Sequence, residues 1–246
     1  PLRTVQAALP VLPELKIPTV GLTSGTNAVR TPHNLYAFPV RANYAEEARK
    51  LVTHVKTLGV TKISVIYTDN PFGISVKDTL LEAFTKEGLT ATPFKLDPAG
   101  ATAAKVVGEA VAGNPQSVFL TMLSQPAVPV IRELKKTTSR NLLYTFSPVD
   151  TTVVLKELGA GASGLGVTQV VPIPAGSRVK VVAEYLQALK ELGRGTASFY
   201  GLEAFIEAKV LVEGLRRAAP VMTPANLIKA LETLRNFDAG DYYVRD

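Results

Sequence analysis

The sequence predicts an α/β protein built on a doubly wound parallel sheet. Two patterns indicate this fold class. Short, continuous apolar runs rich in β-branched residues alternate with stretches whose apolar residues follow helical spacing, as expected for strands covered on both faces. Several helical stretches also end at a glycine just before the next apolar run, in "TLGV", "KEGL" and "ELGA". Strand–helix–strand units repeated in this way form an open sheet with helices on both faces.

The predicted elements follow the chain in a regular order. Strands are expected over residues 17–23, 62–68, 90–96, 117–123, 141–147 and 164–171, with helices over 44–58 and 74–87. After about residue 177 the pattern changes to three long helical stretches with almost no strand between them. Thr223 before Pro224 predicts the start of the third, because threonine caps helices well and proline suits the first helical position.

This change of pattern predicts two lobes. Residues 40–172 are expected to form one self-contained α/β lobe, lobe two. Residues 1–39 and 173–240 are expected to be parts of the other lobe, lobe one, and the chain stops at 241–246 in what looks like a strand. One strand and about four helices cannot complete an α/β lobe, so we expect the chain to be a fragment. Because missing strands would expose apolar edges, residues 1–246 are expected to be oligomeric or to need a second chain.

Composition excludes several classes of function. The net charge is +6, but Lys and Arg are interleaved with Glu along helix faces, so we expect no nucleic-acid partner. The absence of cysteine excludes disulfides and thiolate chemistry. Neither His33 nor His54 has a carboxylate or serine at a suggestive spacing, so no metal, cofactor or catalytic residue is expected.

Two glycine-rich stretches are candidate binding loops. "GAGASG" at 159–164 has the dinucleotide-binding spacing, but a predicted helix precedes it and a strand follows it, which is the reverse of the required context. "GLTSGTNA" at 21–28 follows a predicted strand and offers backbone N–H groups and hydroxyls. Such a loop either binds an anionic group or forms a simple turn.

Two acidic residues follow predicted strands of lobe two. Asp69 and Asp150 lie at the sheet edge where ligands of open α/β proteins bind, and there they could hold an ammonium group. Each is also a typical turn or helix-capping residue. With no nucleophile–base pair in the sequence, the chain is predicted to be a binding protein and not an enzyme.

The order of landmarks resembles a known family. "IPTVGLTSGTNAV", "LYAFPVRANYAEEARKLV", "LGVTKISVIYTDNPFGISVKDTLLEAFTKEGL", "GLGVTQVVPIP" and "FYGLEAFIEAKVLVEGLRRA" are similar, in register, to the leucine/isoleucine/valine-binding family of type I periplasmic substrate-binding proteins. The resemblance implies two doubly wound α/β lobes joined by three crossing strands, the third of them at residues 241–246. It further implies a ligand between the lobes, with lobe one incomplete in this chain. It also implies a periplasmic location, an export signal outside residues 1–246, and a membrane permease of an ABC importer as partner.

The resemblance also implies binding residues in lobe one. The loop that holds the ligand carboxylate in amino-acid-binding members matches Ser24, Gly25 and Thr26. An aromatic at the start of the long lobe-one helix matches Tyr200.

In lobe two the match is less complete. The ligand-packing aromatic, usually tyrosine, matches Phe72, and a further aromatic position is Leu123 here. The acid that pairs with the α-ammonium of the ligand matches Ser147, with Asp150 three residues further on. We therefore expect a small carboxylate-bearing ligand that need not be an amino acid, such as an aromatic or branched organic acid. The alternatives are a ligand-sensing regulator or receptor ectodomain on the same fold and, less favoured, an α/β enzyme.

Overall fold

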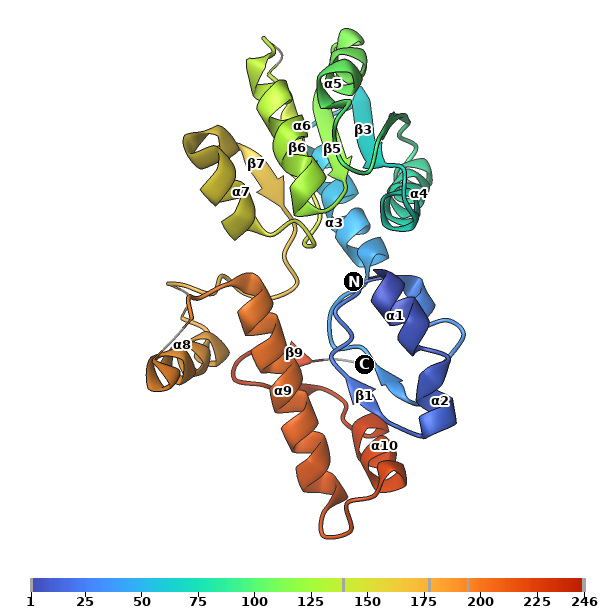
Figure 1. The fold of residues 1–246 in the computed structure, drawn as a ribbon, viewed down its shortest axis with the longest axis vertical. Helices are drawn as coiled ribbons and strands as arrows, with labels where there is room; N and C mark the ends of the chain where they lie inside the picture. The colour runs from blue at the N-terminus through green and yellow to red at the C-terminus, as the bar shows by residue number, and fades with distance from the viewer. Residues whose placement is uncertain (1, 139, 177, 194, 245–246) are drawn as a thin grey trace. The chain divides into compact units, whose positions relative to one another are not determined.

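The computed structural model describes residues 2–138, 140–176, 178–193 and 195–244. The chain divides into two compact units. Unit 1 comprises residues 1–43 and 170–246, and unit 2 comprises residues 44–169. The chain therefore leaves unit 1 once, builds unit 2 as one continuous segment, and returns (Figure 1). The assignment of residues 40–172 to lobe two, and of 241–246 to a connecting strand, stays a prediction; residues 245–246 lie outside the described part of the chain.

Unit 2 is built on one five-stranded parallel sheet. Its strands run in the order β4-β3-β5-β6-β7. Their bounds are β3 (Ile63–Thr68), β4 (Ala91–Leu96), β5 (Ser117–Thr121), β6 (Leu142–Thr145) and β7 (Leu165–Val167). The sheet grows outward from β3 in one direction to β4 and in the other through β5, so β3 and β5 form a topological switch point. The predicted doubly wound parallel sheet is confirmed.

Helices cover both faces of this sheet (Figure 1). They are α3 (Tyr44–Thr57), α4 (Pro71–Lys86), α5 (Ala103–Ala112), α6 (Ser124–Lys136) and α7 (Thr151–Leu158), followed by the short η2 (Gly159–Ala162). Phe119 on β5 meets Phe84 of α4, with ring centroids 5.2 Å apart. The next residue, Leu120, joins the core cluster that α5 and α6 form on the other side. Alternate residues of β5 thus point to opposite faces of the sheet. Because both faces are covered by apolar side chains, the apolar run in the sequence is continuous.

Local signals set where the helices of unit 2 begin and end. Asn70 caps α4 by accepting a hydrogen bond from the Gly73 N–H at 2.9 Å, and Pro71 occupies the first helical position. Helix α4 therefore begins three residues before the predicted start at 74, and Phe72 lies in its first turn and not in a preceding loop. Gly59 and Gly88, which follow α3 and α4, have φ values of +70° and +71°, as the sequence predicts for helix-ending glycines.

Unit 1 is rich in helix and poor in strand within its described residues. Two short pairs of strands are present, β1 (Thr19–Val20) with β2 (Ala37–Phe38), and β8 (Phe237–Asp238) with β9 (Tyr243–Val244). The helices are α1 (Leu2–Ala8), α2 (Val11–Leu15), η1 (Asn27–Val29), α8 (Lys180–Leu192), α9 (Phe199–Ala218) and α10 (Pro224–Glu232). The predicted strand over 17–23 is wrong in length, because β1 extends over only two residues.

The predicted helical half of unit 1 is confirmed. Thr223 caps α10 by accepting a hydrogen bond from the Asn226 N–H at 3.2 Å. Helices α9 and α10 pack closely at Gly214, where an added Cβ would lie 2.7 Å from Leu231 Cδ2. Helix α9 also packs on β1, so the longest helix of the unit connects its two parts (Figure 1).

Two helical glycines of unit 2 give a matched stability test. At Gly73 a Cβ would lie 2.2 Å from the carbonyl oxygen of Thr68, so Gly73→Ala is expected to lower the free energy of unfolding by about 1–3 kcal/mol. At Gly108 a Cβ would have no neighbour within 4 Å, so Gly108→Ala is expected to raise it by about 0.5–1 kcal/mol. Denaturant unfolding of both variants measures the difference, and equal effects would contradict the close turn between β3 and α4.

Candidate functional site

The carboxyl edge of the unit 2 sheet gathers four of the predicted site residues. Strands β3, β5 and β6 are parallel and end at residues 68, 121 and 145, so the segments that follow them lie at one edge. Phe72, Leu123, Ser147 and Asp150 are all in these segments. In doubly wound sheets, ligands bind outside the carboxyl ends of the strands at the switch point. The fold therefore places these four residues at the edge of unit 2 that is suited to a site.

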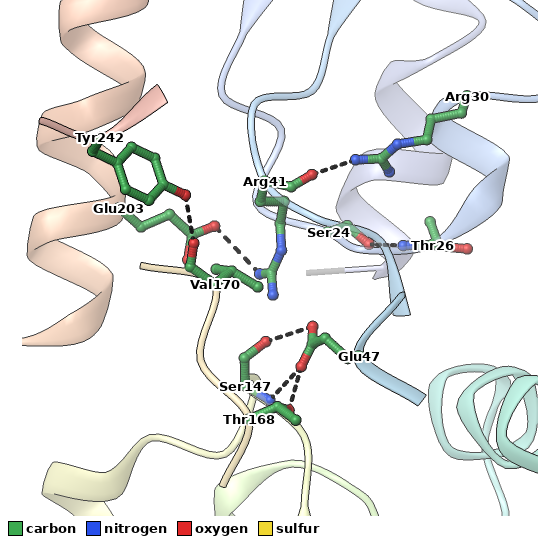
Figure 2. Close-up of polar contacts among 10 residues, drawn as sticks. All are labelled: Ser24, Thr26, Arg30, Arg41, Glu47, Ser147, Thr168, Val170, Glu203 and Tyr242. Carbon is green, nitrogen blue, oxygen red and sulfur yellow. Dashed lines mark hydrogen bonds and ion pairs between the residues drawn. The ribbon is translucent and has the colours of Figure 1, made fainter. Parts of the chain in front are cut away.

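A buried carboxylate that the sequence analysis missed lies at this edge. Glu47, in the first turn of α3, is only 4% exposed. It accepts hydrogen bonds from the Ser147 N–H at 3.0 Å, the Ser147 hydroxyl at 2.8 Å and the Thr168 hydroxyl at 2.5 Å (Figure 2). The carboxylate thereby joins α3 to the segments that follow β6 and β7.

The sequence does contain a signal for Glu47. The apolar residues of α3 include Ala48, Leu51 and Val55 at helical spacing, and Glu47 lies four residues before Leu51 on the same helix face. A carboxylate on the apolar face of an amphipathic helix is a buried charge, and such charges need partners. Its partners were not identifiable, because Ser147 and Thr168 are distant in sequence.

Phe72 belongs to an aromatic cluster within unit 2. Its ring centroid lies 5.7 Å from that of Tyr44, edge to face, and the Tyr44 centroid lies 6.4 Å from that of Phe146. Phe72 itself is 9% exposed. Edge-to-face packing of this kind fixes the ring orientation. That Phe72 contacts a ligand stays a prediction, and the ring that would do so is held rigidly by Tyr44.

The remaining acidic candidates have local structural roles. Asp150 caps α7 by accepting a hydrogen bond from the Thr152 N–H at 2.8 Å, and its own N–H donates to the Ser124 hydroxyl at 2.8 Å. The Asp69 carboxylate pairs with Lys95 at 3.3 Å, with both side chains largely exposed. Leu123 is half-buried directly before α6. Asp150 thus has a capping role, and its contact with a ligand stays a prediction.

Unit 1 contains the other predicted site residues. Ser24, Gly25 and Thr26 form a buried loop after β1, and the Ser24 hydroxyl accepts a weak hydrogen bond from the Thr26 N–H at 3.4 Å (Figure 2). Tyr200 is half-buried in the first turn of α9, which Ser198 caps. The structure therefore distributes the eight predicted residues over the two units, four in each.

A buried group of charges lies behind this loop in unit 1. The Arg41 guanidinium pairs with Glu203 of α9 at 3.3 Å (Figure 2). The Tyr242 hydroxyl donates to the Val170 carbonyl at 2.7 Å, and burial, together with the charge of Glu203, raises the pKa of this phenol. One turn along α9, Glu207 is also buried. Two carboxyl groups thus lie near one guanidinium.

Glu207 packs against the first residue of the loop. A Cβ added to Gly21 would lie 2.6 Å from Glu207 Oε2 and 2.8 Å from Cδ, and Gly21 has a φ of +80°. The carboxyl group therefore occupies the space that a side chain at position 21 would need. Burial and the charge of Glu203, only partly offset by Arg41, raise the pKa of Glu207 to about 7. Near neutral pH this group is partly protonated.

Among the described residues, no group of three or more His, Cys, Asp or Glu side chains could hold a metal ion. Within the same part of the chain, no helix has both the length and the apolar character to cross a membrane.

Replacement of Glu47 tests its structural role. Glu47→Ala would leave an N–H and two hydroxyls without their acceptor, so the free energy of unfolding is expected to fall by roughly 2–4 kcal/mol. The exposed Glu109 on α5 is a matched control, and Glu109→Ala is expected to change stability by less than about 0.5 kcal/mol. Urea unfolding compares the two, and equal stabilities would contradict the hydrogen-bond network.

The raised pKa of Glu207 predicts a pH-dependent stability difference. Its folded pKa of about 7 exceeds the ordinary 4.5, so the folded state binds more protons between these values and stability falls as pH rises through them. Relative to Glu207→Gln, the wild type is expected to lose about 2–3 kcal/mol between pH 4.5 and 8. Chemical denaturation at several pH values measures this. Glu191→Gln, an exposed position on α8, should follow the wild type, and parallel curves for Glu207→Gln would contradict the shift.

Comparisons with known proteins agree with this architecture. A sequence model of the family described as periplasmic binding protein matches residues 3–244. An extracellular ligand-binding receptor from Verminephrobacter eiseniae is 27% identical with a TM-score of 0.86, over 96% of this chain and 70% of that chain. A substrate-binding periplasmic protein from Ralstonia solanacearum is 28% identical with a TM-score of 0.85, over 96% and 68%. A search of curated proteins finds no match.

A more distant structure shares the fold alone. A branched-chain amino acid ABC transporter protein from Thermus thermophilus with bound valine is 16% identical, with a TM-score of 0.83 over 98% of this chain and 65% of that chain. The present chain thus spans about two thirds of the length of these structures. Because the family model matches through both units, the chain belongs to the periplasmic binding protein family and has the predicted type I fold.

Proposed function

We propose that this chain is the solute-binding part of an ABC importer that captures a small carboxylate-bearing solute. Membership of a family of binding proteins supports binding without chemical change, and the valine in the Thermus thermophilus structure is one such carboxylate. The buried loop of Ser24, Gly25 and Thr26 is the proposed carboxylate site. In this proposal, the solute stabilises the arrangement of the two units with which it makes more contacts, so that arrangement becomes more populated. The solute-bound form then docks on the membrane permease from the periplasmic side.

The position of Glu47 is the observation that favours one class of solute over another. The resemblance to amino-acid-binding proteins implies that their ammonium-pairing acid matches Ser147, and the loss of that acid leaves both amino acids and organic acids open as solutes. Glu47 hydrogen-bonds to both the N–H and the hydroxyl of Ser147, so another element supplies a carboxylate at the same edge. Since a buried ammonium needs a paired charge, this favours an amino acid over its des-amino analogue.

Matched solute pairs test the proposal. Titration calorimetry would compare leucine with 4-methylpentanoate, and phenylalanine with 3-phenylpropanoate. The amino acid of a pair is expected to bind tenfold or more tightly than its analogue. Glu47→Gln, which keeps one acceptor oxygen, is expected to weaken amino-acid binding by about tenfold, about 1.4 kcal/mol, and to leave the analogue unchanged.

Other results would redirect or refute the proposal. Glu109→Gln is the control and should bind as the wild type does. Equal affinity for both members of a pair would reassign the solute to organic acids. If no carboxylate binds, neither the proposed solute class nor the role of the loop stands.

A further inference from the structure

Glu207 is a buried group that the proposed function does not use. It is only 9% exposed, and its Oε1 accepts no hydrogen bond from the residues that the structure describes. A buried carboxylate oxygen without a donor is costly when it is charged, and much less so when the group is protonated. The site therefore suits a neutral carboxyl group better than a carboxylate.

The charged and titratable groups in this part of unit 1 explain this preference. Glu203, one turn earlier on α9, is a second acid, and Arg41 pairs with it at 3.3 Å. The Tyr242 phenol lies by Glu203 and donates to a carbonyl, and Arg30 donates to the Arg41 carbonyl (Figure 2). Burial and the charge of Glu203 outweigh the opposing charge of Arg41, and the pKa of Glu207 rises to about 7.

Glu207 also bears directly on the loop at residues 21–26. Its carboxyl atoms occupy the space of a Gly21 side chain, and Gly21 is the residue from which the loop begins. Ser24 and Thr26 follow within the next five residues and are buried. A negative charge on Glu207 would oppose a second negative charge held by this loop, whereas a neutral carboxyl group would not.

We propose that unit 1 binds the anionic group of its solute together with a proton carried by Glu207. The inference rests on the proposed function, in which the loop holds a carboxylate. In the free protein near pH 7.5, Glu207 is partly ionised. When the carboxylate binds, the Glu207 carboxylate takes up a proton from the buffer, so one ligand and a fraction of a proton enter together. The affinity is then constant up to about pH 6 and falls as pH rises through 7 and above.

The test measures affinity and proton exchange on the full chain. The probes are 3-phenylpropanoate, 4-methylpentanoate, phenylalanine and leucine, titrated by calorimetry from pH 5.5 to 8.5. The wild type is expected to show a constant dissociation constant up to about pH 6 and then a rise of up to tenfold per pH unit. Heats at pH 7.5 in phosphate and Tris, which differ in ionisation enthalpy, are expected to show proton uptake.

Variants assign the proton to Glu207. Glu207→Gln is expected to bind the probe at pH 8.5 as tightly as at pH 6 and to take up no proton in this range. Glu191→Gln, an exposed matched control in the same unit, is expected to keep the wild-type profile. If Glu207→Gln does not fold, the number of protons taken up by the wild-type protein still tests the inference. Glu207→Asp, which keeps a titratable carboxyl group, then serves as the second variant.

The outcomes separate this inference from the proposed function. A probe that binds with a flat pH profile, or that releases protons, overturns the inference and leaves the proposed function standing. The same holds if Glu207→Gln keeps the wild-type pH dependence. If none of the four probes binds at any pH, both fail. Proton uptake that disappears in Glu207→Gln supports both.

Discussion

A carboxylate buried in a protein needs hydrogen-bond donors, and in unit 2 the carboxylate of Glu47 accepts hydrogen bonds from three. They come from Ser147 and Thr168, which follow two neighbouring strands. Meeting this requirement fixes the first turn of α3 against the carboxyl edge of the sheet. The aromatic contacts of Tyr44, three residues earlier, depend on the same turn. The geometry of the whole edge therefore depends on one charge and its partners.

Unit 1 handles its buried acids differently. Arg41 pairs with Glu203, but Glu207 has an oxygen that accepts no hydrogen bond from the described residues. Protonation of the Glu207 carboxylate removes the need for a hydrogen-bond donor to this oxygen. The free-energy cost of burying the group therefore depends on pH. Unit 2 thus uses a satisfied carboxylate to fix structure, whereas unit 1 holds one whose charge can change.

Much of the fold was predictable from sequence because unit 2 obeys simple periodicity. Its central strands β3 and β5 are buried on both faces, so their apolar runs are continuous, and glycines with positive φ follow α3, α4 and α7. The predicted start of α4 at residue 74 is three residues too late, because Asn70 caps the helix and Pro71 is its first residue. In unit 1 only two residues of the run 17–23 are strand, since strand length depends on pairing and not on composition.

The site was less predictable, because its key groups meet only in three dimensions. Ser24 and Thr26 could be proposed from their place after a strand, but Glu207 reaches their loop from a helix near the other end of the chain. The resemblance drew attention to a missing acid at Ser147, and no local pattern could reveal that Glu47 approaches it. From sequence, Asp150 is suited both to ligand binding and to helix capping. The hydrogen bond that its carboxylate accepts from the Thr152 N–H shows the capping role.

The bond between Glu47 and Thr168 has a consequence for modularity. Unit 2 begins at residue 44 and ends at 169, so the bond joins residues close to the two ends of this segment. A compact segment with adjacent ends can be transplanted into a loop of another protein, or rejoined and opened elsewhere by circular permutation, with little strain. Unit 2 therefore has the geometry of an insertable segment. The Glu47–Thr168 hydrogen bond lies within this segment, so it would be kept when the segment is moved into another protein.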